Sequence, residues 1–395
     1  MQIVKKHIRR VLPKSWEKLL IDPRRHIHRW GFEELIDAVM KAMLSGCKNL
    51  RELELLTAAS GERIPDTTMR DLLVQIDPSP LEEEIAKGVK QAARSHELDE
   101  KELPFNLIVI DGKALTTCDY EVDEYSRNCS QKGVTKYVTM GLRAFYASSP
   151  VKLLMGQELI NQGTNDRGAF GCFLDKLVRL YGRTNLLEVI SIDAGITSIK
   201  NAKQIVEHNL DYIMALKDAR SRKATRLAIE FLGQRKRADK IEKEFINGRQ
   251  VIRRLYRCET PEMKGWEHAT EFWRINKETI NKNGTVTYED RYFITSIPKQ
   301  TLTNSHILKA IRLHWSIENN ANWVIDTAWG EDTNPWCNQA IELLSLMRII
   351  AYNVIARLKL RRLKHLDKTV ITWKGVLMLT RLTLFPTVKT SIAFS

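Results

Sequence analysis

The sequence has no long apolar run. None of its apolar stretches approaches the roughly 18 to 20 residues that a membrane-spanning helix needs. The basic first residues, MQIVKKHIRRVLPKSW, contain no apolar block of signal-peptide length. These two absences argue against a membrane protein and against a secreted one, so we expect a cytoplasmic protein.

Cysteine is scarce and scattered. The six cysteines form no CxxC pair, and this spacing excludes both a zinc knuckle and a dense disulfide framework. A reducing compartment suits this pattern. The cysteines are Cys47, Cys118, Cys129, Cys172, Cys258 and Cys337.

Acidic residues are too few to balance the basic ones. The chain has 395 residues, of which 62 are Lys or Arg and 48 are Asp or Glu, so its formal charge is +14. Because 43% of the residues are hydrophobic, the chain can build a real core, either as two or three domains or as one large domain with an insertion. The charge favours a polyanionic partner, and double-stranded DNA is the first candidate.

Basic charge is concentrated in three segments. Residues 1–30 hold nine Lys or Arg against two acids, residues 220–257 hold thirteen against four, and residues 357–374 hold seven against one. One such run is usually a solvated helix face, but three in one chain favour a nucleic-acid surface. Among these residues we select Arg24 and Arg25 as candidate DNA contacts.

Residues 1–103 predict a basic, helical N-terminal domain. FEELIDAVMKAMLSG and NLRELELLTAAS carry apolar residues at helical spacing. IPDTTMRDLLVQI follows as a third helix, which Asp66 or Thr67 could cap. Short helices joined by tight turns suit a helix-turn-helix DNA-binding unit, but the same periodicity also fits a plain helical bundle.

From about residue 104 the pattern becomes α/β. PFNLIVID, KYVTMGLRAFYA and VKLLMGQELI are predicted strands, and GAFGCFLDKLVRLYG is a predicted helix. LLEVISID, IKNAKQIVEHNL and DYIMALK then predict a strand, a helix and a strand. This alternation indicates an α/β sheet with its apolar strands covered on both faces.

Residues 224–300 interrupt this alternation. Two alternating segments turn at Asn247-Gly248 and at Asn283-Gly284, and Asn-Gly is a strong hairpin signal. We therefore predict a β-rich insertion that divides the α/β domain into residues 104–223 and 301–356. In the second part, HILKAIRLHWSIENNANWVIDTAW predicts a helix and NQAIELLSLMRIIAYNVIARLKL a long amphipathic helix. Residues 357–395 are predicted to be a basic C-terminal tail.

Two aspartates follow the apolar strand runs, Asp111 after LIVI and Asp193 after VISI. Acids at the carboxyl ends of neighbouring strands can converge on one site, where carboxylate oxygens suit two Mg²⁺ ions. One ion would activate the attacking oxygen and the other would stabilise the leaving oxygen of a phosphodiester. An aspartate also commonly leaves a strand through a turn, and Gly112 and Gly195 fit that interpretation.

Glu318 is the candidate for a third acid. It lies in a segment rich in tryptophan and isoleucine, where a buried acid needs a partner. On a regular helix, His314, Glu318 and Asn322 would share one face. Asp326 is next along this polar stripe, and it remains open whether it replaces or supports Glu318.

Taken in order, these residues resemble the DDE transposases of bacterial insertion sequences, in particular the H-repeat-associated (ISAs-type) group. VIDGKALT resembles that group's IDGK-L block, and ISIDAGITSIKNAKQIVEHNLDYIMALK resembles its TIDA…DYxLALK block. RLHWSIENNANWVIDTAWGED is similar to its HWxIENxLHWxLDVxFxED block, and LLSLMRIIAYNVI to its closing helix. The four blocks extend over roughly residues 105–357.

The resemblance implies a ribonuclease-H-like fold with a strand-rich insertion before the glutamate. It also implies that Asp111, Asp193 and Glu318 are catalytic and bind Mg²⁺ or Mn²⁺, and that Lys113 and Lys217 approach phosphates. The expected activity is cleavage of DNA at the terminal inverted repeats, followed by transfer of the 3′-OH strand. The protein would then be nucleoid-associated, with a homodimer on DNA as the smallest assembly that joins two ends.

Departures from the group's pattern keep two alternatives open. The YxxRxxxExxxxxxK pattern of wider relatives is absent, and Asn322-Trp323 replaces the group's second His-Trp. His314 and Asn322 are accordingly only candidate DNA contacts. The alternatives are a catalytically silent or domesticated DNA-binding protein and a ribonuclease-H-like nuclease for hybrids or junctions.

Overall fold

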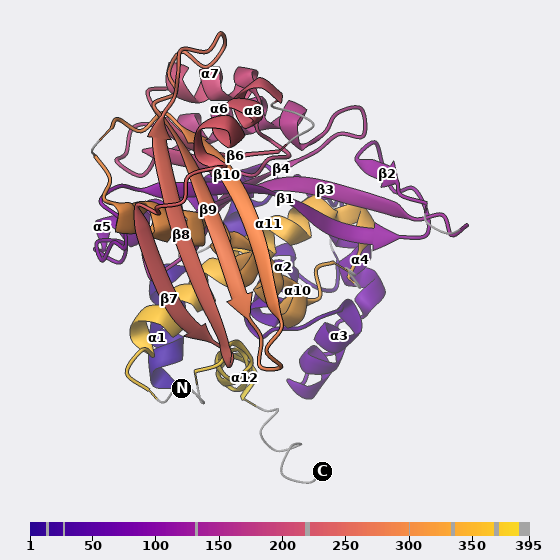
Figure 1. Cartoon of the computed structure of the whole chain (residues 1–395). Helices are drawn as coiled ribbons and strands as arrows, with labels where there is room; N and C mark the ends of the chain where they lie inside the picture. The colour runs from indigo at the N-terminus through magenta and orange to yellow at the C-terminus, as the bar shows by residue number, and fades with distance from the viewer. Residues whose placement is uncertain are drawn as a thin grey trace.

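The chain folds around one large mixed sheet with helices on both sides (Figure 1). The computed structural model describes residues 1–12, 16–26, 28–130, 133–217, 222–299, 301–332, 336–366 and 371–386. The predicted basic segments 220–257 and 357–395 therefore lie partly outside the described residues. Within the described part, no helix is long and apolar enough to cross a membrane.

The first six strands form the centre of the molecule. Three antiparallel strands in the order β4-β3-β1 are followed by β5 and β6, which run parallel to β1. This arrangement confirms the predicted α/β class of the sheet. The strands are β1 (Leu107–Cys118), β2 (Ser126–Asn128), β3 (Tyr137–Tyr146), β4 (Leu153–Leu159), β5 (Val189–Ile192) and β6 (Asp211–Leu216).

The four strands of the predicted insertion continue this sheet. β10 pairs antiparallel with β6, and β9, β8 and β7 follow outward to the edge. The hairpin at Asn247-Gly248 is confirmed, and both residues have positive φ, 50° and 75°, as a tight two-residue turn requires. The elements are α8 (Arg222–Leu232), β7 (Lys240–Ile246), β8 (Arg249–Glu259), β9 (Glu271–Ile280) and β10 (Val286–Thr295).

Helices cover both faces of the β1–β6 part of the sheet. α6 (Asp166–Tyr181) and α7 (Ile199–Glu207) lie on one side, and α11 (Ile341–Arg357) lies on the other (Figure 1). The prediction that α11 is amphipathic is wrong, because every residue of this helix except Glu342 is buried. Its buried polar side chains have partners inside the protein, and helical periodicity does not show that such side chains are buried.

Residues 2–94 contain helices and no strand among the described residues. They pack through α2 and α5 against α11, within the same hydrophobic core as the sheet. Asp66 and Thr67 do not cap α4, which starts at Asp66 after Pro65. The elements are α1 (Gln2–Val11), η1 (Trp16–Leu19), α2 (Phe32–Leu44), α3 (Leu50–Ala59), α4 (Asp66–Leu73) and α5 (Pro80–Arg94).

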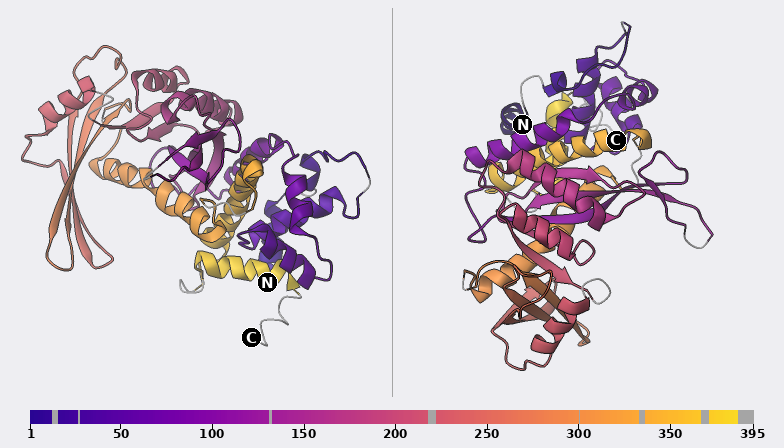
Figure 2. Two further views of the ribbon diagram at one scale, coloured as in Figure 1. Left: turned by 90° about the vertical axis from the view of Figure 1, so that its right-hand side faces the viewer. Right: turned by 90° about the horizontal axis from the view of Figure 1, so that it is seen from above.

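The insertion and the N-terminal helices lie at opposite ends of the molecule, as Figure 2 (left) shows. Beyond α11, the predicted tail contains α12 (Trp373–Leu384), which packs against α1 and α2. The remaining short elements are α9 (Asn304–His314), η2 (Glu318–Asn322), α10 (Trp323–Trp329), η3 (Asn338–Ala340) and η4 (Leu358–Arg362).

Candidate active site

Asp111 lies inside a strand and does not end one. β1 continues to Cys118, Asp111 is opposite Arg143 of β3, and Gly112 is opposite Leu142. The predicted turn at Gly112 is therefore wrong. What ends after Ile110 is the pairing of β1 with β5, so Asp111 is the first β1 residue beyond the buried parallel ladder.

Asp193 follows β5 directly and starts a turn. The last parallel pair is Ile110 with Ile192, so the next residues of the two strands are Asp111 and Asp193. The Asp193 carboxylate accepts a hydrogen bond from the backbone N–H of Ile196 at 3.0 Å. Here the turn interpretation and the site interpretation are both compatible with the structure, because one carboxylate oxygen holds the turn.

The predicted regular helix over residues 306–329 is interrupted. α9 ends at His314, and residues Glu318–Asn322 form a π-helical turn before α10 begins. Because the helix is interrupted at Trp315 and again by the π-helical turn, the predicted polar stripe does not form: His314 and Asn322 are buried, whereas Glu318 is exposed. Such single π-turns inside helices are frequent at functional sites.

His314, the last residue of α9, connects this helix to β5. Its Nδ1 lies 2.9 Å from the hydroxyl of Ser191, two residues before Asp193. Burial lowers the pKa of His314 to about 4, against a smaller opposing effect of Asp193. His314 is therefore a neutral buried side chain, and in this conformation it does not face solvent as a DNA contact would.

The charges of two other acids act on Asp111 at this edge of the sheet. The pKa of Asp111 is raised to about 7, first by burial and then by the negative charges of Asp193 and Glu318, while the hydrogen bond from the Gly112 N–H opposes them. Like charges that disfavour each other's ionisation must lie close together. The charges of Asp193 and Glu318 thus both act on Asp111, and the β1–β5 pairing places Asp193 next to it.

Asp166 is a fourth acid that the sequence patterns did not single out. It begins α6, and its charge also acts on Asp111. A Cβ atom on Gly112 would lie only 2.5 Å from Oδ2 of Asp166, so glycine is needed there to admit a carboxylate. The glycine after Asp111 was the available signal, but it was interpreted as a turn residue.

Lys113 and Asp326 form an ion pair. Nζ of Lys113 lies 2.6 Å from Oδ1 of Asp326, and Lys113 is buried. This placement gives no support to the prediction that Lys113 contacts DNA. It also distinguishes the two competing acids, because Asp326 is occupied by Lys113 whereas Glu318 acts on Asp111.

A family profile described as Transposase DDE domain matches residues 103–354. The chain belongs to this family. The resemblance to the H-repeat-associated group is confirmed by the H repeat-associated putative transposase YhhI of Escherichia coli (strain K12), which is 27% identical over 279 residues. This match covers 66% of the chain and 65% of the relative, which is slightly less than two thirds of its length.

Among solved structures, the chain is similar to a cryo-EM structure of piggyBac transposase in a synaptic complex with hairpin DNA. The TM-score is 0.48 at 12% sequence identity, over 100% of this chain and 80% of that one.

The donor set of the DDE domain fits a hard divalent cation. Carboxylate oxygens are the ligands that Mg²⁺ and Mn²⁺ prefer, and a cation would relieve the repulsion that raises the pKa of Asp111. As placed, no three His, Cys, Asp or Glu side chains in the described ranges lie close enough to share one ion. The fit therefore rests on the donor chemistry and on the mutual electrostatic effect of the acids.

The remaining predicted DNA contacts are Lys217, in the DDE domain, and Arg24 and Arg25, before it. Lys217 is exposed directly after β6, and residues 218–221 that follow it lie outside the described ranges. Arg24 is held by Asp22 and by the carbonyl oxygen of Trp30, whereas Arg25 is exposed. The described structure leaves Arg25 as the better placed of these two arginines for a surface contact.

Glu318 is one of the residues that line a cleft of about 430 Å³. The cleft lies between the inner face of β7–β10 and α9, and Glu318 is at its margin. The guanidinium of Arg291 lies 4.0 Å from the ring centroid of Trp315, also in the lining. The other basic residues that line it are Arg253, Lys277 and Arg312.

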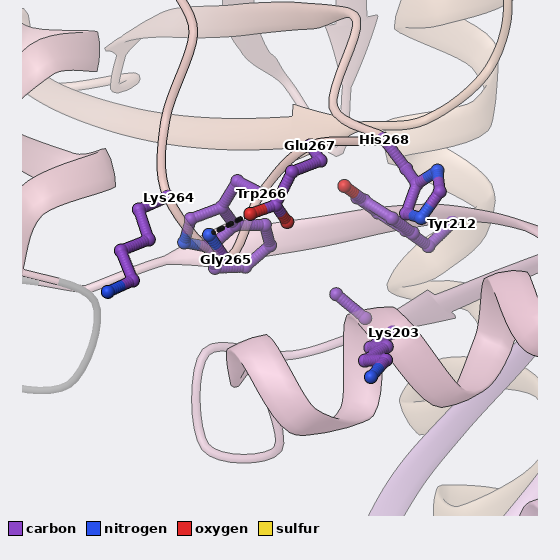
Figure 3. Close-up of a pocket in the computed structure, with 8 residues that line it drawn as sticks. Lys203, Tyr212, Lys264, Gly265, Trp266, Glu267 and His268 are labelled. Atoms are coloured by element: carbon purple, nitrogen blue, oxygen red, sulfur yellow. Dashed lines mark hydrogen bonds between the residues drawn. The ribbon is translucent and has the colours of Figure 1, made fainter.

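A second pocket of about 440 Å³ lies where the β8–β9 connection meets α7 and β6. Figure 3 shows Trp266 beside Tyr212, with the Glu267 carboxylate accepting a hydrogen bond from the backbone N–H of Gly265 at 2.7 Å. None of the predicted site residues lines this pocket, so it is separate from the candidate active site.

Proposed function

We propose that the chain is an insertion-sequence transposase that binds terminal inverted repeats, cuts DNA there and transfers the freed 3′-OH strand. The observation that carries this proposal is that Asp111 and Asp193 both follow the end of the β1–β5 ladder, with the charge of Glu318 acting on Asp111, in a chain of the transposase DDE family. We assign the three acids as catalytic and metal-binding. The β4-β3-β1-β5-β6 sheet is then the ribonuclease-H-like part of the fold.

The protein's own groups hold the acids for this role. Asp111 accepts a hydrogen bond from the Gly112 N–H at 2.9 Å, and Asp193 is held through Ile196. Glu318 is exposed and begins the π-helical turn. Two bound Mg²⁺ or Mn²⁺ ions would supply an activated attacking oxygen and neutralise charge on the leaving oxygen.

Double-stranded DNA is the proposed partner. The net charge of +14 favours binding to a phosphate backbone, and the basic cleft between β7–β10 and α9 opens beside Glu318. The cations there are paired with glutamates, such as Arg253 with Glu244. A DNA phosphate can replace such a glutamate without leaving the cation unpaired. Joining two transposon ends requires at least a homodimer.

The test uses purified protein, Mg²⁺ and duplexes that carry the element's own terminal inverted repeats. Asp193→Ala is expected to reduce cutting by roughly a hundredfold or more, the scale of removing one group of a preorganised charged site, while DNA binding persists. Asp175→Ala is the matched control, because Asp175 is an exposed aspartate paired with His208. Cleavage by Asp193→Ala at the control's rate would contradict the assignment.

Two further measurements separate the alternatives. Calorimetric titration with Mn²⁺ should show binding that Asp111→Asn weakens, whereas a silent DNA-binding protein would show no uptake dependent on these carboxylates. Competition between an RNA–DNA hybrid and the inverted-repeat duplex should favour the duplex. Preference for the hybrid would support the nuclease interpretation.

A further inference from the structure

A buried polar cluster lies between the sheet and α11, next to the candidate site. Arg143 of β3 donates to Glu331 at 2.6 Å, to Ser345 of α11 at 2.8 Å and to Gln157 of β4 at 2.9 Å. Arg348 of α11 lies 3.9 Å from the same glutamate. Arg143, Glu331, Ser345 and Arg348 have no exposed surface.

The cluster is charged. Burial alone would raise the pKa of Glu331, but the positive charges of Arg143 and Arg348 outweigh that effect and lower it. An ion pair without solvent contact is weak support for stability, since well-packed apolar residues often serve as well or better. What such a pair does specify is which segments lie next to each other.

The sheet register places this cluster beside Asp111. Arg143 is directly opposite Asp111 across β1 and β3, and directly opposite residues point to the same face of a sheet. Lys113 is two residues further along β1, so it shares that face, and there it binds Asp326 of α10. Two basic side chains of neighbouring strands therefore reach the segment that follows Glu318.

Both acids of this segment are held. Asp326 lies within α10, and Glu331 follows Gly330, the left-handed residue with φ of 62° that ends α10. Arg348 links the two pairs, because the charges of Glu331 and Asp326 both act on it. α10 begins directly after the π-turn that carries Glu318, so fixing α10 fixes the end of that turn.

We propose that Arg143, Glu331, Lys113 and Asp326 are positioning residues, which clamp α10 on β1 and β3 and thereby set where Glu318 stands relative to Asp111. The importance of this clamp for catalysis rests on the proposed function, whereas its mechanical role does not. None of the four residues needs to touch DNA or a metal ion.

The experiment compares Glu331→Gln with Glu97→Gln. Both glutamates are buried and paired with an arginine, Glu331 with Arg143 and Glu97 with Arg357 at 2.8 Å. Glu97 joins the end of α5 to α1 and α11 and therefore controls for the loss of a buried ion pair as such. Asp326→Asn is the third variant. The side chain of Asp326 is partly exposed, so this substitution is milder and serves if Glu331→Gln folds poorly.

The first readout is hydrogen exchange of full-length protein without metal or DNA. Glu331→Gln and Asp326→Asn should increase exchange in residues 318–329, whereas Glu97→Gln should increase it in α1 and at the ends of α5 and α11, and not in residues 318–329. Unchanged exchange of residues 318–329 in both clamp variants would overturn the proposal, whatever the protein's activity.

The second readout is Mn²⁺ affinity by calorimetry. Glu331→Gln should weaken binding by roughly 10-fold to 100-fold, the range for groups that orient metal ligands, while Glu97→Gln should match the wild type. Equal weakening in both variants would overturn the positioning role. If the wild type takes up no Mn²⁺, the proposed function fails, and hydrogen exchange still decides the clamp.

Discussion

The β1–β6 and β7–β10 parts of the sheet are hydrogen-bonded neighbours with opposite chemistry. β5 is VISI and fully buried, whereas β7 is KIEKEFI and mostly exposed. In the first part helices cover both faces, and the polar groups that remain are buried acids and their partners. In the second part ion pairs between strands and with α9 hold one face together. The same sheet thus combines a buried part, β1–β6, that carries Asp111 with a charged and more exposed part, β7–β10.

This difference teaches that strand pairing alone does not define a functional unit. β10 pairs with β6 along four residues, yet burial falls sharply toward β7. Apolar burial stabilises in proportion to area, while exposed ion pairs contribute little. Substitutions in the two parts should therefore differ strongly in their cost.

The largest expected effect is a loss of stability caused by a substitution in the buried part of the sheet. Ile190→Ala in β5, where the side chain is 0% exposed, should lower the free energy of unfolding by roughly 2–5 kcal/mol. Ile241→Ala in β7, where 51% is exposed, should change it by no more than about 0.5 kcal/mol. Urea denaturation of both variants measures the contrast, and equal costs would contradict it.

The second effect is a pH dependence of stability where α1 contacts α11, a helix that covers the buried part. His7 of α1 donates from Nε2 to the carbonyl oxygen of Val354 at 3.0 Å. The pKa of His7 is lowered to about 4, first by burial and also by the charges of Arg357 and Arg10, while the hydrogen bond to Val354 opposes this shift. Because the unfolded state binds a proton more readily, His7's contribution is complete above pH 6.5 and is lost as the pH falls toward 4.

The full loss at His7 amounts to roughly 3 kcal/mol at 1.36 kcal/mol per pKa unit. His7→Gln keeps a donor toward Val354 and removes the titration. Its free energy of unfolding should therefore vary less between pH 6.5 and 4 than that of the wild type. Parallel pH profiles of the two proteins would exclude this role.

The smallest expected effect concerns the insertion. Arg312 of α9 binds Glu242 at 2.9 Å and also binds Glu244 of β7. Because these side chains are partly exposed, Arg312→Gln should cost only about 0.2–1 kcal/mol, and the cost should shrink in about 1 M NaCl through screening. Unfolding measured at low and high salt tests this, and a cost that is independent of salt would count against it.

Much of the fold was predictable from local pattern. The apolar runs before Asp111 and Asp193, the helix at α6 and the Asn247-Gly248 hairpin follow from periodicity and turn chemistry. α11 was misjudged because its buried Arg348 and Arg357 look like a polar face. The boundaries of the predicted domains remain predictions, since the helices before β1 share one core with the sheet.

The site was only partly predictable, for a geometric reason. Asp111, Asp193 and Glu318 remain the predicted acids, but the regular helix expected around Glu318 is interrupted: α9 ends at the buried His314, and the exposed Glu318 begins a π-helical turn. Backbone packing, which fixes such a turn, leaves no mark in helical spacing. Asp166 was missed because its position next to Gly112 depends on how the start of α6 packs on the sheet.

The sequence by itself determined the family, the basic charge and the order of the three acids, because each is written in local residue types and their succession. Only the tertiary structure decided the partners. It paired Lys113 with Asp326, set Arg143 opposite Asp111 and placed Glu331 between two arginines. These contacts join residues up to 213 positions apart, and such distances are closed only by the packing of the whole core.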